Sequence, residues 1–211
     1  MTVELVVVPD LTVEACNRFL ALRPRTVALA GGSTPRPFYE RLAGYEFPWP
    51  QTEVFFGDER CVPPDHPASN YRMANEALLS KAPARVHRMA GEICDAPGYE
   101  DELTHVFGPE LPVFDLVLLG LGEDGHTASL FPGDAALDEK ERRVVRVQRP
   151  DFGRLTLTLP VLSAAKVAMF LVTGESRRDA LRRLVERDDI PAARVASDKV
   201  VIVTDQAAWP A

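Results

Sequence analysis

Residues 114–132 read FDLVLLGLGEDGHTASLFP, an apolar run that passes directly into glycines, two carboxylates and a histidine. The segment 116–119 has no polar alternation and ends at turn residues, which is typical of a strand buried in a parallel sheet. Ligands of open α/β sheets bind beyond the carboxyl ends of the strands. The pair Asp124 and His126 therefore follows this strand at a place where catalytic groups usually lie.

The surrounding sequence repeats this pattern of short apolar runs separated by segments of helical periodicity. Because strands that alternate with helices form right-handed βαβ units, the order predicts an α/β fold. We expect a doubly wound, mainly parallel sheet with helices on both faces, a three-layer, Rossmann-like arrangement. No linker or internal repeat interrupts the pattern, so we interpret residues 1–211 as a single domain. The predicted strands cover residues 3–8, 27–30, 54–56, 116–119, 144–147, 154–159, 167–172 and 200–203, and the predicted helices cover 11–22, 35–42, 71–79, 98–106 and 177–186.

Composition and charge narrow the class of protein. The chain has 211 residues and a formal net charge of −7, which argues against broad binding to nucleic acid or to an anionic membrane. There is no signal segment at the N-terminus and no apolar run near the roughly 20 residues that span a bilayer. Cys16, Cys61 and Cys94 are odd in number and lack zinc-type spacing. We expect a cytoplasmic protein, a monomer or weak homodimer, with reduced thiols and no metal site.

The turn at residues 31–35, GGSTP, leaves one predicted strand and enters a helix. Such a turn exposes unpaired backbone N–H groups at the positive end of a helix, where a phosphate can bind. Ser33 and Thr34 add hydroxyl donors, and either could cap the helix, with Pro35 in its first turn. The turn alone is equally consistent with a capped helix that binds no ligand.

A second strand end carries charged side chains. Residues 57–60, GDER, follow the predicted strand at 54–56, and the loop beyond them supplies Ser69, Asn70 and Arg72. An isolated loop of this composition is more often a solvated charge cluster followed by a capped helix. Its position at the same sheet edge as the other loops favours a place in a binding site.

Residues 120–125 match the dinucleotide fingerprint G-x-G-x-x-G, but the context does not fit. The fingerprint requires the glycines to open a long helix, with an acidic residue roughly 20 positions further on. Pro132 and Gly133 end any helix after about one turn, and the position roughly 20 residues beyond Gly125 lies in Val144-Val145. We therefore predict a tight glycine loop and no dinucleotide cofactor.

His126 is then the candidate catalytic group of this loop. Asp124 can orient the imidazole or stabilise its charged form, as a carboxylate behind a general base does. An unperturbed imidazole titrates at about 6.5, so it can accept a proton near neutral pH. Arg154 and Arg177, each at the start of a predicted element, suit phosphate through the planar guanidinium fork. Pairing of either arginine with a neighbouring carboxylate is the alternative.

Together these segments resemble the 6-phosphogluconolactonase family. The matching pieces occur in the family's order and cover most of the chain, at residues 31–35, 57–60 through 69–72, 120–132, 154–160 and 173–175. The resemblance implies hydrolysis of 6-phospho-D-glucono-1,5-lactone to 6-phosphogluconate in the oxidative pentose phosphate pathway, without a cofactor. It also implies that the partner is a small sugar phosphate lactone and that the activated ester needs no metal.

The resemblance implies roles for individual residues. His126, oriented by Asp124, would take a proton from the attacking water, and Arg72 or the N–H groups of the glycine loop would stabilise the oxyanion. The remaining substrate contacts would come from Gly32, Ser33 and Thr34 with Arg154 and Arg177 at the phosphate, and from Asp58 and Asn70 at the sugar hydroxyls. Arg177 stands where the family commonly has lysine, which leaves the geometry of its phosphate contact open.

Two alternatives remain from other functional classes. Related glucosamine-6-phosphate deaminases and isomerases share an Asp-Gly-His segment but continue Ile-Ala-Phe-Asn-Glu-Pro, whereas this chain continues with residues 127–132, TASLFP, and has no glutamate there. Sugar-phosphate-sensing domains of bacterial regulators carry a DNA-binding segment before the domain. Since the first predicted strand begins at Val3, we expect no such segment.

Overall fold

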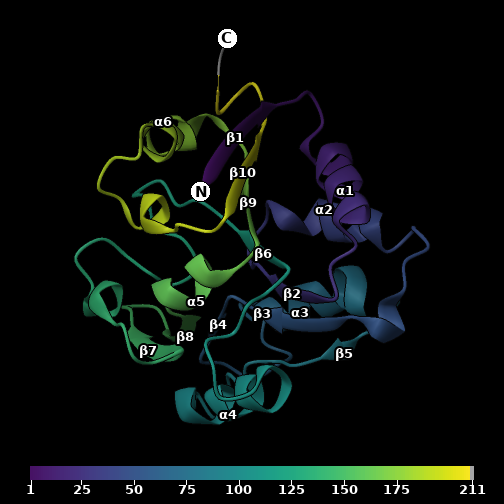
Figure 1. Cartoon of the computed structure of the whole chain (residues 1–211), viewed down its shortest axis with the longest axis vertical. Helices are drawn as coiled ribbons and strands as arrows, with labels where there is room; N and C mark the ends of the chain where they lie inside the picture. Colours follow the sequence, from purple (N-terminus) through teal and green to yellow (C-terminus); the bar gives the residue numbers. More distant parts are fainter. Residues whose placement is uncertain (210–211) are drawn as a thin grey trace.

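The computed structural model describes residues 1–209 and builds them around a seven-stranded sheet (Figure 1). All neighbouring strands in this sheet run parallel, in the order β1-β10-β9-β6-β2-β3-β5. The bounds are β1 Thr2–Val7, β2 Thr26–Leu29, β3 Glu53–Phe56, β5 Arg85–Val86, β6 Leu116–Leu119, β9 Val167–Val172 and β10 Lys199–Thr204. The strand predicted at 116–119 is β6, near the centre of the sheet, and all four of its residues are buried.

Helices cover both faces of the sheet, which confirms the predicted three-layer α/β fold. α1 and α2 lie on one side of the central strands, and α5 and α6 lie on the other (Figure 1). The bounds are α1 Leu11–Leu22, α2 Pro35–Leu42, α3 Asn70–Ala74, α4 Ala96–Phe107, α5 Leu159–Ala164 and α6 Arg178–Glu186. α3 continues as a π-helical segment over Asn75–Leu79, so the single helix predicted at 71–79 is built from two types of turn.

The first helix shows how local signals produce these elements. Asp10 caps α1, because its side chain accepts a hydrogen bond from the backbone N–H of Val13 at 3.1 Å. Leu11, Ala15 and Phe19 recur at helical spacing on one face and are buried. This apolar stripe packs the helix onto the sheet, and Arg23 ends it in a left-handed conformation with φ 47°.

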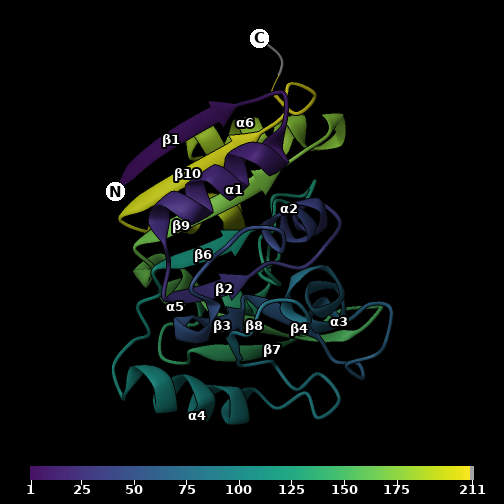
Figure 2. The same ribbon diagram turned by 90° about the vertical axis from the view of Figure 1, so that its right-hand side faces the viewer.

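A second, three-stranded antiparallel sheet lies beside the first and was not predicted as a sheet. It pairs β4 (Asp58–Arg60) with β8 (Gly153–Leu157) and β8 with β7 (Val144–Gln148). Figure 2 shows these strands packed between β3 and α4. The strand predicted at 154–159 ends earlier, at Leu157, because the chain enters α5 at Leu159.

The capping hydroxyls behave differently at the two predicted helix starts. Ser69 caps α3 by accepting the backbone N–H of Arg72 at 3.1 Å. Thr34 precedes α2 but makes no side-chain cap, because its backbone is already helical. Its hydroxyl lies 3.1 Å from the hydroxyl of Thr173 instead, so the prediction of a capping hydroxyl at 33 or 34 was wrong. The interaction links the turn before α2 to the end of β9.

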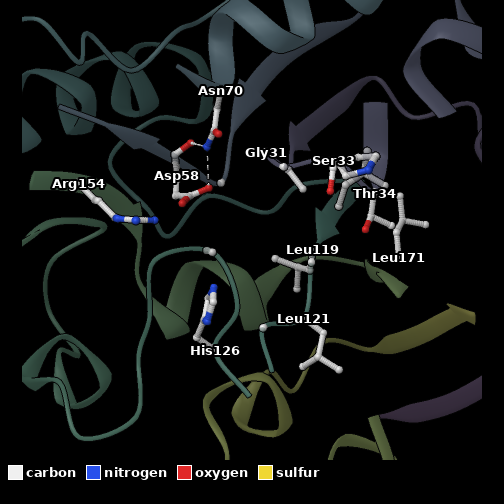
Figure 3. A pocket seen from close by; sticks show the side chains of 18 of the residues that line it. Gly31, Ser33, Thr34, Asp58, Asn70, Leu119, Leu121, His126, Arg154 and Leu171 are labelled. Atoms are coloured by element: carbon white, nitrogen blue, oxygen red, sulfur yellow. Dashed lines mark hydrogen bonds between the residues drawn. The ribbon is translucent and has the colours of Figure 1, made fainter. Parts of the chain in front are cut away.

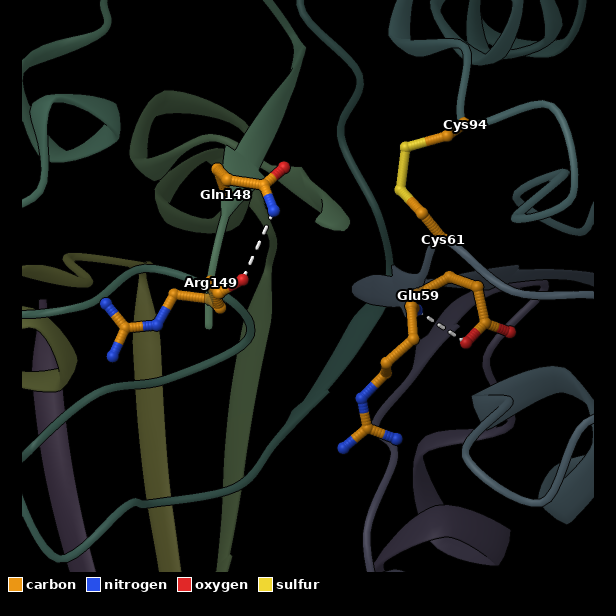
Figure 4. The surroundings of a disulfide bond; sticks show 6 residues. Glu59, Cys61, Cys94, Gln148 and Arg149 are labelled. Carbon is orange, nitrogen blue, oxygen red and sulfur yellow. Dashed lines mark hydrogen bonds between the residues drawn. A yellow bond between two sulfur atoms is a disulfide. The ribbon is translucent and has the colours of Figure 1, made fainter. Parts of the chain in front are cut away.

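The prediction that all cysteines are reduced was also wrong. Cys61 and Cys94 form a disulfide with a Cα–Cα distance of 5.1 Å, which joins the residue after β4 to the loop before α4 (Figure 4). Their separation of 33 residues hides the pairing in the sequence. Cys16 of α1 is a free thiol buried against α2, and burial raises its pKa to about 11. Within residues 1–209, no helix is long and apolar enough to cross a membrane.

Candidate active site

The carboxyl ends of β2, β3, β6 and β9 surround a cavity of about 260 Å³ (Figure 3). This is the sheet edge at which open α/β folds bind ligands. The three predicted strand-end loops therefore meet at one site. The predicted residues that line the cavity are Gly32, Ser33, Thr34, Asp58, Asn70, His126, Arg154 and Arg177.

The turn before α2 forms one wall of the cavity. Gly32 has φ 97°, a left-handed conformation that only glycine adopts without strain. The start of the turn is fixed by Tyr39, whose hydroxyl donates to the backbone carbonyl of Ala30 at 2.9 Å and accepts its N–H at 3.0 Å. The hydroxyls of Ser33 and Thr34 are thus presented beside the N-terminus of α2, an arrangement suited to an anion.

Asp58 and Asn70 are buried together on the opposite wall. The Asn70 amide donates to the Asp58 carboxylate at 3.0 Å and to the Asp58 carbonyl at 2.8 Å (Figure 3). The second carboxylate oxygen of Asp58 accepts the hydroxyl of Ser129 at 2.6 Å. A Cβ on Gly31 would lie only 1.9 Å from the Asn70 side-chain oxygen. Glycine at 31 therefore allows Asn70 to occupy this position.

Glu59 fixes the same loop through hydrogen bonds. It is 2% exposed and accepts four hydrogen bonds, from the backbone N–H groups of Arg60, Asn70 and Tyr71 and from the Ser69 hydroxyl. Burial raises the pKa of this carboxyl, although the hydrogen bonds oppose the rise. Glu59 therefore closes the loop between β4 and α3 and does not line the cavity.

Arg60 completes this wall, although no sequence pattern predicted a role for it in the site. Its guanidinium donates to the Asn70 side-chain oxygen at 2.5 Å and to the Ala68 carbonyl at 2.8 Å. It lines the cavity together with Arg154. Within the described part of the chain, neither arginine has a hydrogen-bond partner for its buried Nε. The sequence signal that could have identified Arg60 is the alternation of side chains along β4, which places Asp58 and Arg60 on one face and Glu59 on the other.

His126 projects into the cavity from the loop after β6 (Figure 3). Its Nδ1 lies 2.6 Å from the Asp124 carboxylate, which also accepts the His126 backbone N–H at 3.1 Å. The Gly122 N–H donates to the His126 carbonyl at 2.9 Å, and a Cβ on Gly122 would collide with the imidazole at 2.0 Å. Partial burial of Asp124 opposes ionisation, but the hydrogen bonds from His126 lower its pKa below the usual value. The carboxylate is thus held ionised beside Nδ1, and Nε2 remains for chemistry.

Arg72 lies away from the site in which it was predicted. Its guanidinium donates to the Glu76 carboxylate and to the Asp65 carbonyl, both at 2.8 Å, and it does not line the cavity. Glu76 lies one helical turn further on, where an i,i+4 ion pair forms readily. Arg72 therefore drops out as an oxyanion donor. No group of three or more metal-ligating side chains is present among residues 1–209.

The family model of glucosamine-6-phosphate isomerases and 6-phosphogluconolactonases matches residues 8–204. The chain belongs to this family. The 6-phosphogluconolactonase of Synechocystis is 46% identical over 166 residues, which cover 74% of this chain and 69% of the relative. The probable 6-phosphogluconolactonase of Schizosaccharomyces pombe is 38% identical over 83% of this chain and 77% of its own. The crystal structure of 6-phosphogluconolactonase from Thermotoga maritima superimposes with a TM-score of 0.86 at 30% identity, over 97% of this chain and all of that one.

Arg177, one of the two arginines predicted to bind phosphate, lies shortly after the end of β9. The residue lies in a short 3-10 turn over Glu175–Arg177 that begins after Gly174, and it lines the cavity. Gly174 has φ 89°, and its N–H donates to the carboxylate of Asp205 at 3.2 Å. Thr173, four residues before Arg177, contacts Thr34 in the turn before α2. Arg177 therefore follows shortly after the segment that contacts this turn.

Proposed function

We propose that this chain hydrolyses 6-phospho-D-glucono-1,5-lactone to 6-phosphogluconate, the lactonase step of the oxidative pentose phosphate pathway. The observation that carries the proposal is the 2.6 Å contact between Asp124 and Nδ1 of His126, with the imidazole facing a cavity that the turn before α2 also lines. The named relatives that cover most of the chain support the same substrate.

The phosphate is assigned to the turn before α2. The hydroxyls of Ser33 and Thr34 and the backbone N–H groups around Gly32 would donate to its oxygens. Arg154 and Arg177 would supply the counter-charge, since a guanidinium pairs two donors with two phosphate oxygens. The side chains of Arg154 and Arg177 reach the cavity from β8 and from the segment after β9, so the anion would be held between separate elements.

The opposite wall is assigned to the sugar. Asp58 and Asn70 face the cavity, and each retains lone pairs for hydroxyl groups of the substrate. Because Asp58 already accepts from Asn70 and Ser129, its orientation is set before substrate arrives. Such pre-organisation lets a hydroxyl hydrogen bond form without reorganising the site.

His126 would begin the reaction by accepting a proton from water on Nε2 as the water oxygen attacks the lactone carbonyl carbon. The backbone N–H groups of Gly120 and Leu121 and the guanidinium of Arg60 are the donors available for the oxyanion. Collapse of the tetrahedral intermediate breaks the bond to the ring oxygen, which takes the proton back from Nε2. The products are one carboxyl and one hydroxyl group, so the added water is fully accounted for.

The test is addition of the protein to freshly generated lactone, followed by NMR or by acid release. We expect ring opening well above the spontaneous rate, and a rate no faster than spontaneous overturns the proposed function. H126A is expected to lose about 10²- to 10⁴-fold in kcat, the range of a lost general base. H105A, which changes an exposed histidine of α4, is the matched control and keeps the wild-type rate. A wild-type rate for H126A removes the general-base role.

The same preparation tests the deaminase alternative, because glucosamine 6-phosphate would release ammonia. We expect none. The loop after His126 turns back through Thr127, whose hydroxyl donates to the Gly120 carbonyl at 2.9 Å, and Ser129 points to Asp58. The segment 127–132 thus places no carboxylate over the cavity.

A further inference from the structure

Phe131 is a buried aromatic residue whose ring contacts side chains of the proposed site. It is 6% exposed, and its centroid lies 4.5 Å from that of the His126 imidazole, at an interplanar angle of 34°. The guanidinium carbon of Arg149 lies 4.0 Å from the same centroid, and that of Arg154 lies 5.5 Å from it. One aromatic side chain therefore contacts the proposed base and two cations.

The contact adds a constraint on His126 that its hydrogen bonds do not supply. Asp124 fixes the position of Nδ1, but a single hydrogen bond at one edge leaves the plane of the ring free to turn about that edge. A ring packed against the imidazole limits this rotation. The direction of Nε2 toward the cavity thus depends on Phe131 as well as on Asp124.

The arginines depend on the same ring. Arg154 is tied to Asp151 at 2.7 Å, whereas no carboxylate within residues 1–209 pairs with Arg149, whose cationic head lies over Phe131. A cation over an aromatic face is attracted by the negative face of the ring. The attraction of the ring therefore helps to hold the guanidinium groups of both arginines beside it, although like charges repel each other.

We propose that Phe131 is a positioning residue of the lactonase reaction, which holds the imidazole plane of His126 and the guanidinium of Arg154 through its aromatic face. The inference rests on the proposed function. It assigns Phe131 no contact with substrate. It requires an aromatic ring at this position, so side chains of similar volume without a π face will not replace it.

The experiment compares F131L with F131Y in the lactone assay. For F131L we expect a fall in kcat of about 10- to 100-fold, because misplacement of a catalytic group by about 1 Å has that effect. F131Y keeps the face and is expected within about threefold of wild type.

F107L is the matched control, because Phe107 is a partly buried aromatic residue at the end of α4 that packs against the core and does not line the cavity. Thermal unfolding is measured for each variant, and F131M replaces F131L if the latter does not fold. A wild-type kcat in a folded leucine or methionine variant overturns the inference. Equal impairment of a folded F131Y also overturns it. Both outcomes count against the inference only if the wild-type protein is active. An inactive wild-type protein overturns the proposed function instead.

Discussion

Arg60 and Arg154 lie directly opposite each other on neighbouring antiparallel strands, as partners in the register of β4 and β8. Like charges in this arrangement destabilise a sheet. Asn70 and Ala68 accept from Arg60, and Asp151 accepts from Arg154, but the buried Nε of each has no partner in the described chain. The pair is consistent with a site built to receive an anion at a cost in stability.

Removing one of these charges is expected to weaken substrate binding without lowering the unfolding temperature. R154M should unfold at the wild-type temperature or up to a few degrees above it without ligand, because a repulsion worth at most about 1 kcal/mol is relieved. Its KM for the lactone should rise at least about tenfold, and inorganic phosphate should no longer raise its unfolding temperature. R182M, on the exposed side of α6, is the control. An unchanged KM would show that Arg154 binds no substrate.

The close approach of Gly31 and Asn70 predicts a large effect from one methyl group. In G31A the new Cβ would overlap the Asn70 side-chain oxygen and force the amide away from Asp58 and Arg60. We expect kcat/KM to fall at least about tenfold. G44A, where the nearest atom to a new Cβ would be 3.4 Å away, should behave as wild type. Steady-state kinetics on both variants test this, and equal activities would contradict it.

Glu59 is expected to matter for folding. In E59Q one of the two accepting oxygens becomes an amide nitrogen that faces two donors, so the free energy of unfolding at pH 7 should fall by about 2–3 kcal/mol. Urea titration measures the loss, with E110Q on an exposed loop as control. A loss below that of the control would show that these hydrogen bonds are not needed.

The raised pKa of Glu59 also predicts a pH dependence. The folded chain binds the Glu59 proton more tightly than the unfolded chain, whose value is near 4.5. The contribution of Glu59 is therefore most favourable below that value and declines as pH rises through the higher folded value. E59Q should lack this decline when its unfolding free energy is followed from pH 4 upward. A decline of the same size in the variant would assign it to another group.

The disulfide predicts both a thiol count and a stability difference. Denatured protein should titrate as one thiol without reductant, that of Cys16, because Cys61 and Cys94 are bonded. Opening a loop of 33 residues should lower the free energy of unfolding by about 4 kcal/mol. Reductant should have this effect on wild type and none on C61S/C94S. A count of three thiols would show that the bond does not form.

The elements that sequence patterns predicted well are those with continuous apolar character. The strand at 116–119 and the helix at 11–22 have their expected bounds, because burial of Leu and Val runs and a complete helical stripe leave few alternatives. β4 is three polar residues long and forms only through pairing with β8, almost a hundred positions away. Local propensity carries no trace of such a strand.

The same difference separates the correct from the incorrect predictions for the candidate site. His126 and Asp124 are two residues apart, so their contact follows from a tight loop, which the neighbouring glycines predict. Arg60 was missed because its place in the cavity depends on the face of β4, and Arg72 was misplaced because Glu76 competes for it within one helical turn. Contacts set by tertiary packing were the ones that the sequence could not reveal.

The parallel pairing of β1 with β10 has a consequence for how the chain folds. Thr2 has Lys199 as its register partner, and β1 forms the edge of the sheet with no second strand beside it in the described chain. During synthesis β1 therefore stays unpaired until β10, made almost 200 residues later, has left the ribosome. A contact of such long range slows folding and lengthens the time in which β1 is open to aggregation.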